Sequence, residues 1–175
     1  GEGARAIRAG SIGSVDDLRK LMEEVLPGDR VFRAAFASKV VRNSKQARYY
    51  LRTLEKVARQ REGLTDELGA NLDENEVNLE HIMPLSPDKE AWGHLSADDH
   101  TVFARRLGNM ALMLEKENTG AKNASFEEKK KFYVASELIT TRELAYIDGW
   151  GIEEISNRQD EMADLALEAW PLSTQ

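Results

Sequence analysis

The chain has 175 residues and contains no cysteine. This absence excludes disulfide bonds, cysteine nucleophiles and zinc sites built from thiolates. Side-chain oxygen atoms and imidazole nitrogens are the ligands that remain for a metal. Any metal that binds should therefore be a hard cation, and magnesium is the first choice.

Long apolar runs are missing as well. No stretch approaches the roughly 20 apolar residues that cross a bilayer, and the opening GEGARAIRAG lacks the apolar core of a signal peptide. Hydrophobic residues still make up 41% of the chain, which is enough to build a core. We therefore expect a soluble, cytoplasmic, globular protein without a membrane partner.

Net positive charge, which DNA binding uses to displace counterions, is missing too, since the formal charge is −7. The charges nevertheless fall into blocks. Residues 1–61 carry 14 Lys and Arg against 7 Asp and Glu, and residues 62–100 carry 1 against 11. Residues 101–142 carry 8 against 5, and residues 143–175 carry 1 against 8. Such blocks allow a basic face on an acidic chain, although an ordinary solvated surface fits the same numbers.

The first third of the chain has the apolar spacing of helices. Ser14 can cap a helix that has two Asp residues in its first turn, and Pro27-Gly28 should end it. Further helices are expected over residues 31–38 and 44–61. The acidic, polar stretch that follows, residues 62–76, is predicted to be a connection.

The spacing changes after this connection. The stretch EVNLEHI alternates between apolar and polar residues up to Pro84, which predicts a short strand. A second strand is expected in LGNMALML, residues 107–114, after a loop and one short helix at about 96–106. Ser125 begins a capping box that opens a helix. The helices of the last third are expected from Ser125 to about Ser136, from Thr140 or Thr141, and from about Gly151 to Trp170.

Three groups of polar residues accompany the two strands. Glu80-His81-Ile82-Met83-Pro84 closes the first strand, Asn109 stands near the start of the second, and Asn118 follows nine positions later in a polar loop. Hydrolysis of a phosphodiester needs a base that takes a proton from water and a cation that neutralises the charge developing on the phosphate. Neutral histidine can be that base, because its usual pKa is about 6.5.

The order and spacing of these groups resemble the HNH endonucleases. Their usual motif reads Asp-His-Ile-x-Pro, then Asn-Leu-x-x-Leu, then an Asn or His nine positions after the first Asn. The fold expected from this resemblance is mainly α with a small two-stranded antiparallel hairpin, in which a ββα-metal nuclease core is embedded in helices. The chain departs from the motif at Glu80, where Asp is usual, and the longer side chain moves the carboxylate.

A narrower resemblance covers about residues 78–171. The stretches LEHIMP, RRLGNMALM and KNASFEEKKKFYVAS, with Trp150, Arg158 and Trp170-Pro171, resemble the C-terminal nuclease domain of GmrSD-type restriction endonucleases. Those enzymes normally begin with a nucleotide-hydrolysing sensor domain of ParB-like fold, so a fragment of a longer protein is expected. Its expected parts are an N-terminal helical part (1–61), the acidic connection (62–76) and the nuclease core with C-terminal helices (77–175), packed as one compact unit.

The resemblance also implies roles for the site residues. His81 would be the general base, and Glu80 and Asn118 would be ligands of a divalent metal, Mg²⁺ or alternatively Mn²⁺. Asn123 lies in the same polar loop and is the alternative to Asn118 as a ligand. Asn109 would hold the geometry of strand and loop and orient His81, a role in which errors of about 1 Å are costly.

Basic residues after the second strand are the predicted DNA contacts, namely Lys122, Lys129 and Lys130. The simplest interpretation of the lysines at 129–131 is nevertheless a solvated helix face, with phosphate contact as the alternative. His94 and His100 are expected to be ordinary surface or loop residues. The three tryptophans, Trp92, Trp150 and Trp170, are expected to anchor the core rather than stack on bases.

The sequence therefore predicts a metal-dependent DNA endonuclease domain that nicks or cleaves DNA in a restriction system directed against phage. Sensing of the DNA modification would belong to the N-terminal domain. The alternative is a non-catalytic helical module that keeps the nuclease scaffold and binds DNA or a partner subunit. The combination of His81, Asn109 and Asn118 favours the enzyme.

Overall fold

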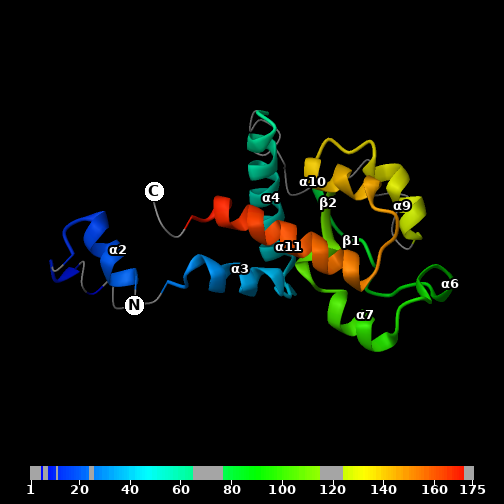
Figure 1. The fold of residues 1–175 in the computed structure, drawn as a ribbon, viewed down its shortest axis with the longest axis horizontal. Coiled ribbons are helices and arrows are strands. Elements are labelled where there is room, and N and C mark those ends of the chain that lie inside the picture. Colours follow the sequence, from blue (N-terminus) through cyan, green and yellow to red (C-terminus); the bar gives the residue numbers. More distant parts are fainter. Residues whose placement is uncertain are drawn as a thin grey trace.

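Two long helices, α4 (Ser44–Arg61) and α11 (Ile152–Ala169), cross at the centre of the molecule, and α11 also packs along α3 (Asp29–Ala37) (Figure 1). The computed structural model describes residues 5, 8–10, 12–23, 26–64, 77–114 and 124–171. Arg33 of α3 donates from Nε to Asp164 of α11 at 2.5 Å, and Arg61 of α4 pairs with Glu168 of the same helix. Helix α11 therefore joins segments that are far apart in the sequence.

The helices of the first third begin where their capping residues predict. The Ser14 hydroxyl accepts a hydrogen bond from the N–H of Asp17 at 3.1 Å, at the start of α2 (Val15–Glu23). Asn43 caps α4 by accepting from the N–H groups of Lys45 and Gln46. The predicted bounds of α4 are confirmed, because its cap is followed by an uninterrupted apolar stripe.

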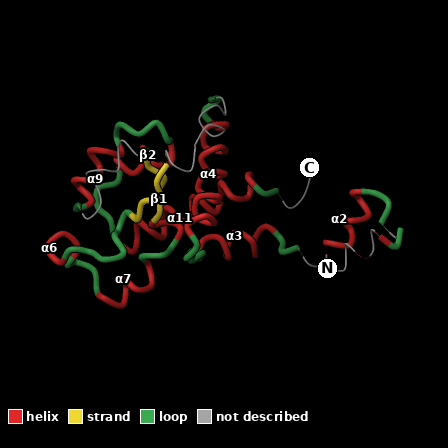
Figure 2. Tube along the Cα trace, turned by 180° about the vertical axis from the view of Figure 1, so that it is seen from behind, coloured by secondary structure: helices red, strands yellow, loops and turns green. Residues whose placement is uncertain are grey.

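The sheet is an antiparallel hairpin of two strands, β1 (Val77–His81) and β2 (Met110–Leu114) (Figure 2). Its register pairs His81 with Met110 and Glu80 with Ala111. Side chains alternate across a pleated strand, so His81 and Glu80 belong to opposite faces of the hairpin. The prediction of a mainly helical chain with a small hairpin is confirmed.

The connection between the strands carries two short helices, α6 (Lys89–Trp92) and α7 (Ala97–Phe103), where the sequence predicted one. Asp88 caps α6 through the N–H groups of Glu90 and Ala91, and Ser96 caps α7 through the N–H of Asp99. With four residues, α6 is too short to show a helical period, so the prediction missed it. A single 3₁₀ turn, η1 (Leu107–Asn109), then leads into β2.

Helix α9 (Phe126–Tyr133) follows the hairpin and begins at the predicted capping box. The Ser125 hydroxyl accepts from the N–H of Glu128, and the Glu128 carboxylate accepts from the N–H of Ser125. Two short elements come next, α10 (Ile139–Arg142) and the 3₁₀ turn η2 (Glu143–Tyr146). The buried Glu55 of α4 accepts from the N–H groups of Ile139 and Thr140, which fixes the start of α10.

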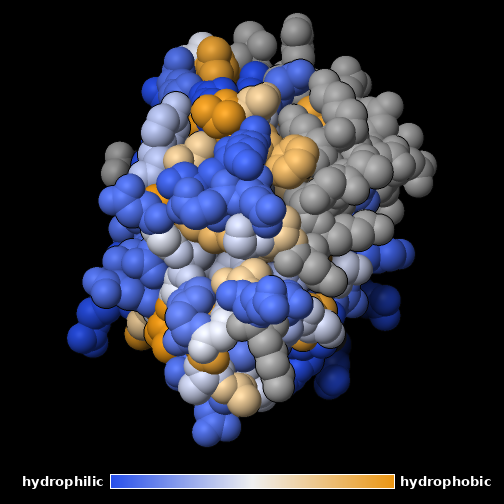
Figure 3. Space-filling view, turned by 90° about the vertical axis from the view of Figure 1, so that its right-hand side faces the viewer, coloured by the Kyte–Doolittle hydropathy of each residue, from blue (hydrophilic) through white to orange (hydrophobic). Residues whose placement is uncertain are grey.

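Apolar side chains pack on both faces of the hairpin. One cluster joins Leu112 to α4 and α11, and a second joins Met113 to α9 and to the connection between the strands. Trp92 and Trp150 are buried in the second cluster and Trp170 packs against the first, which confirms their expected place in the core. Hydrophilic side chains predominate among the described residues seen from the α6 and α9 end of the molecule (Figure 3). In the described ranges, no helix has the length and apolarity needed to cross a membrane.

Candidate active site

The chain leaves β1 at His81 and immediately meets Asn109, the last residue before β2. The N–H of Ile82 donates to the carbonyl oxygen of Asn109 at 2.9 Å. His81 and Asn109 are 28 positions apart in the sequence, but Ile82, the residue after His81, bonds directly to the backbone of Asn109. The structure brings together these two predicted site residues.

The side chain of Asn109 is fully buried and has four hydrogen-bond partners. Its Oδ1 accepts from the N–H of Met83 at 2.8 Å and from the indole Nε1 of Trp150 at 3.0 Å. Its Nδ2 donates to the carbonyl oxygens of Met83 at 2.9 Å and Ala104 at 3.0 Å. Both oxygen lone pairs and both amide protons are thus used, so the amide has one orientation.

Helix α11 holds the segment that carries Asn109. Arg158 is buried and donates to the carbonyl oxygens of Gly108 at 2.6 Å and Met110 at 2.8 Å, the residues on either side of Asn109. Burial lowers the pKa of Arg158 to about 10, so it stays charged near neutrality. Gln159 accepts from the N–H of Gly108 at 3.1 Å. Arg158 and Gln159 thus hold the backbone around Asn109 in place. The sequence analysis did not identify Gln159.

His81 has the properties of an uncharged base. Its Nε2 is buried and has no hydrogen-bond partner in the described part of the chain. Burial lowers the pKa of His81, and the nearby positive charges of Arg105 and Lys129 lower it further. The imidazole is therefore neutral near pH 7 and has a nitrogen without a partner. Arg105 begins the quoted stretch RRLGNMALM, but its place beside His81 was not predicted from the sequence.

Glu80 lies on the other face of β1 and forms a buried ion pair with Lys129 of α9. The side chain of Lys129 is fully buried and that of Glu80 is 9% exposed. Burial raises the pKa of Glu80 and lowers that of Lys129, while each partner's charge opposes the shift of the other. The ammonium also donates to the carbonyl oxygens of His81 at 3.0 Å and Ile82 at 3.1 Å.

The expectation that Lys129 lies on a solvated helix face and contacts DNA is wrong. Phe126, Lys129 and Tyr133 lie on the buried face of α9, because positions three and four apart share one side of a helix. Lys130, four positions after Phe126, lies at the edge of that face, with its Nζ 5.9 Å from the centroid of the Phe126 ring. Its side chain is 22% exposed, pairs with Glu127 at 3.6 Å and remains available for a phosphate contact.

Asn118, Asn123 and Lys122 lie outside the described residues. Within the described ranges, no group of three or more His, Asp or Glu side chains could hold a metal. Glu80 offers one oxygen, since Lys129 contacts Oε1 and no described residue bonds to Oε2. One protein oxygen suits a hard cation whose other ligands are water and phosphate, so the residues fit a weakly held Mg²⁺.

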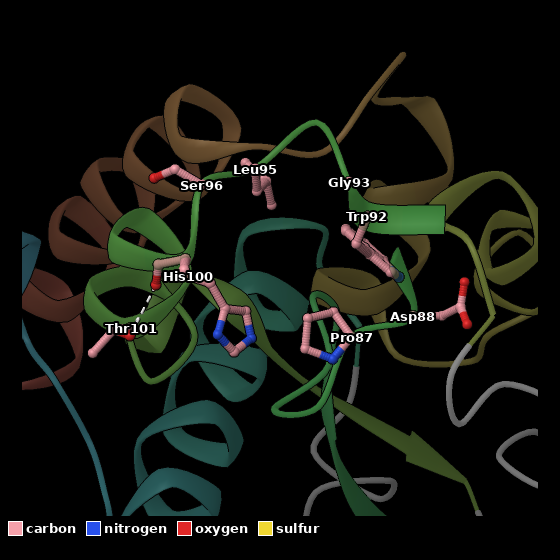
Figure 4. A pocket seen from close by; sticks show the side chains of 9 residues that line it. Pro87, Asp88, Trp92, Gly93, Leu95, Ser96, His100 and Thr101 are labelled. Atoms are coloured by element: carbon pink, nitrogen blue, oxygen red, sulfur yellow. Dashed lines mark hydrogen bonds between the residues drawn. The ribbon is translucent and has the colours of Figure 1, made fainter. Parts of the chain in front are cut away.

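The two other histidines tie the connection to the site. His100 Nε2 lies 2.8 Å from the carbonyl oxygen of Pro84, and His94 Nε2 lies 3.1 Å from that of Trp150. His100 also lines a pocket of about 500 Å³ between α6 and α7, together with Pro87 (Figure 4). Both histidines were expected to be ordinary surface or loop residues. This is confirmed for His94, which is exposed in a turn, whereas His100 is half-buried in α7.

Comparison with models of known protein families identifies the family of the chain. A sequence model of the protein family described as "GmrSD restriction endonucleases, C-terminal domain" matches residues 26–165. No curated protein matches the chain. The matched range includes α3, α4, the hairpin, α9 and most of α11.

Proposed function

The chain belongs to the family of C-terminal domains of GmrSD restriction endonucleases, and from this premise we propose that it is the DNA-cleaving domain of such an enzyme. The observation that carries the proposal is the half-buried, neutral imidazole of His81, with a buried Nε2, beside a turn fixed by Asn109. This combination suits a base in phosphodiester hydrolysis. A solvated surface turn would need neither the buried nitrogen nor the fixed amide.

In this proposal, His81 accepts a proton from the attacking water through Nε2. The lowered pKa keeps the imidazole unprotonated, and no described residue hydrogen-bonds to the buried Nε2, so binding of DNA would have to open a path for water to this nitrogen. General base catalysis of this kind contributes about 100- to 10,000-fold to the rate. Asn109 acts through the backbone by holding the turn that follows His81.

The hairpin and α9 would form an HNH-like ββα-metal core. The order of β1, β2 and α9 and the packing of Lys129 of α9 against the end of β1 support this assignment. A divalent metal, most simply Mg²⁺, would be held by Oε2 of Glu80 and by Asn118, with Asn123 as the alternative. When bound, it would neutralise charge that develops on the phosphate. In this proposal the core is of the HNH class, binds a metal and acts in the cytoplasm.

DNA is the substrate expected of a restriction endonuclease domain. Arg105 beside His81 and the partly exposed Lys130 of α9 are described cations that could contact phosphates, and Lys122 is a further candidate. A separate N-terminal domain would sense the DNA modification. The N-terminal helices (1–61), the acidic connection (62–76) and the core with its C-terminal helices (77–175) would work as one unit.

One observation favours a second function. Glu80 already has a cation partner in Lys129, as expected of a scaffold that binds DNA or a partner subunit without cutting. Such a module would not need a metal.

Cleavage of supercoiled plasmid separates the two functions. The nuclease should nick or linearise plasmid with Mg²⁺ or Mn²⁺, lose this activity in EDTA, and lose at least about 100-fold in His81→Ala. His94→Ala is the matched control, because His94 contacts the carbonyl of Trp150 rather than the turn. Full activity in folded His81→Ala would contradict the role of His81. Tight DNA binding by the unsubstituted chain, without cleavage under any of these conditions, would favour the non-catalytic module.

A further inference from the structure

Lys129 is fully buried and has three acceptors at the exit of β1. Its Nζ contacts Oε1 of Glu80 and donates to the carbonyl oxygens of His81 at 3.0 Å and Ile82 at 3.1 Å. An ammonium has three protons, so these three acceptors saturate it. A lysine in this position has no access to solvent or to DNA.

The same two peptide groups are held from their other side by Asn109. The N–H of Ile82 donates to the backbone oxygen of Asn109 at 2.9 Å, and the N–H of Met83 donates to its Oδ1 at 2.8 Å. Two successive peptide groups, 81–82 and 82–83, are therefore held in the same way. In each, the carbonyl oxygen accepts from Lys129 and the N–H donates to Asn109. Rotation of either peptide would break both contacts.

Stability alone gives a poor reason for this arrangement. A buried ion pair can often be replaced by apolar groups of similar volume without loss of stability, and a methionine would fill the same space. The ammonium is distinguished by its two additional bonds to the backbone that follows His81. An error of about 1 Å in the position of a reacting group can cost about 100-fold in rate, so fixing this backbone matters for catalysis.

We propose that Lys129 is a positioning residue that acts with Asn109 to clamp the two peptide groups after His81. The inference rests on the proposed function for its kinetic consequence, but the clamp itself is testable without activity. If the ammonium restrains the backbone, its removal should make these two peptide groups less ordered. If Lys129 only neutralises Glu80, removal of the pair should leave the backbone as ordered as before.

Amide hydrogen exchange tests the clamp directly. The unsubstituted protein is compared with Glu80→Gln/Lys129→Met, so that neither protein has an unpaired buried charge and both keep similar side-chain volumes. The amides of Ile82 and Met83 should exchange at least about tenfold faster in the double variant, while amides of α4 report global opening in the same samples. Equal protection of Ile82 and Met83 in the two proteins would overturn the proposal.

The absence of native cysteine makes a chemical rescue possible. Lys129→Cys would carry the one thiol of the chain, which is alkylated in the unfolded state with 2-bromoethylamine and refolded, giving a lysine analogue that differs by one sulfur. Alkylation with 1-bromopropane gives a side chain of the same length without the charge. The propyl form should show a kcat at least about tenfold lower than the aminoethyl form, with an unchanged KM for DNA.

Two outcomes of this rescue would reject the positioning role. Equal kcat for the two alkylated forms would mean that an ammonium at this position does not serve catalysis. A raised KM with unchanged kcat in the propyl form would mean that Lys129 contacts DNA. If the unsubstituted chain cuts no DNA, the proposed function fails, while the exchange comparison still decides whether Lys129 clamps the turn.

Discussion

The side-chain amide of Asn109 brackets the backbone of Met83, accepting a hydrogen bond from its N–H at 2.8 Å and donating one to its carbonyl oxygen at 2.9 Å. This pairing imitates the way one peptide group pairs with another across a sheet. It continues the contact between β1 and β2 into the turn that follows His81. The first two predictions concern this segment.

Asn109→Ala should lower the free energy of unfolding by about 3 kcal/mol, because it leaves buried partners such as the indole of Trp150 unsatisfied. Chemical denaturation measures the loss. Asn157→Ala, an exposed position on α11, is the control and should stay within about 0.5 kcal/mol. Equal, small losses in both variants would show that the amide does not hold the turn.

Gly108→Ala should destabilise the fold by about 1–3 kcal/mol, because a side chain there overpacks the contact with α11. The added Cβ would lie 2.3 Å from the carbonyl oxygen of Ile155 and 2.8 Å from Cβ of Gln159. Gly149→Ala is the matched control, since no heavy atom lies within 4 Å of its Cβ position. Thermal unfolding of the two variants decides the matter, and a tolerated Gly108→Ala would disprove this close packing.

The pH dependence of cleavage should reflect the lowered pKa of His81. A base acts in its unprotonated form, so kcat/KM should be level from about pH 6.5 to 8 and fall only as the pH drops through a value below 6.5. Arg105→Gln removes one nearby positive charge, which makes protonation of His81 easier and moves this fall to higher pH. A profile that Arg105→Gln leaves unchanged, or moves to lower pH, would contradict the assignment.

Reversal of the partly exposed Lys130 and the exposed Lys131, Lys130→Glu with Lys131→Glu, should weaken DNA binding and flatten its dependence on salt. Each phosphate contact that is lost removes about one released counterion from the slope of log affinity against log salt. Binding to a short duplex at several salt concentrations measures both quantities, with Lys20→Glu on α2 as the control. If neither quantity changes, the lysines form only a solvated helix face.

The capped, periodic parts of the fold could be predicted from the sequence. Ser125 and Glu128 located α9, and the alternation from Val77 to His81 located β1, since these signals arise from residues a few positions apart. The short helix α6 could not be recognised, because four residues span barely one helical turn and no apolar position can recur within it. Local spacing thus predicted the elements that carry the site.

The sequence-based prediction of the site was wrong about the surroundings of Lys129. Three consecutive lysines suggested one solvated patch, although the spacing from Phe126 to Lys129 to Tyr133 already places Lys129 on the buried side. The partners of Asn109 were beyond prediction for a different reason. Ala104, Met83 and Trp150 reach it only after the connection and the later helices have folded, and no local pattern encodes those contacts.

The position of Gln159 late in the chain affects when the site can form during translation. It joins the carbonyl of Phe36, 123 positions earlier, to the N–H of Gly108, 51 positions earlier. A ribosome adds about 5–20 residues per second, so a nascent chain spends seconds with the N-terminal helices and the hairpin complete but α11 still unmade. Throughout that interval Gly108 and Asn109 lack the helix that holds them. The catalytic geometry is thus among the last features that translation completes, and a chain that stalls before residue 158 is expected to be an inactive one.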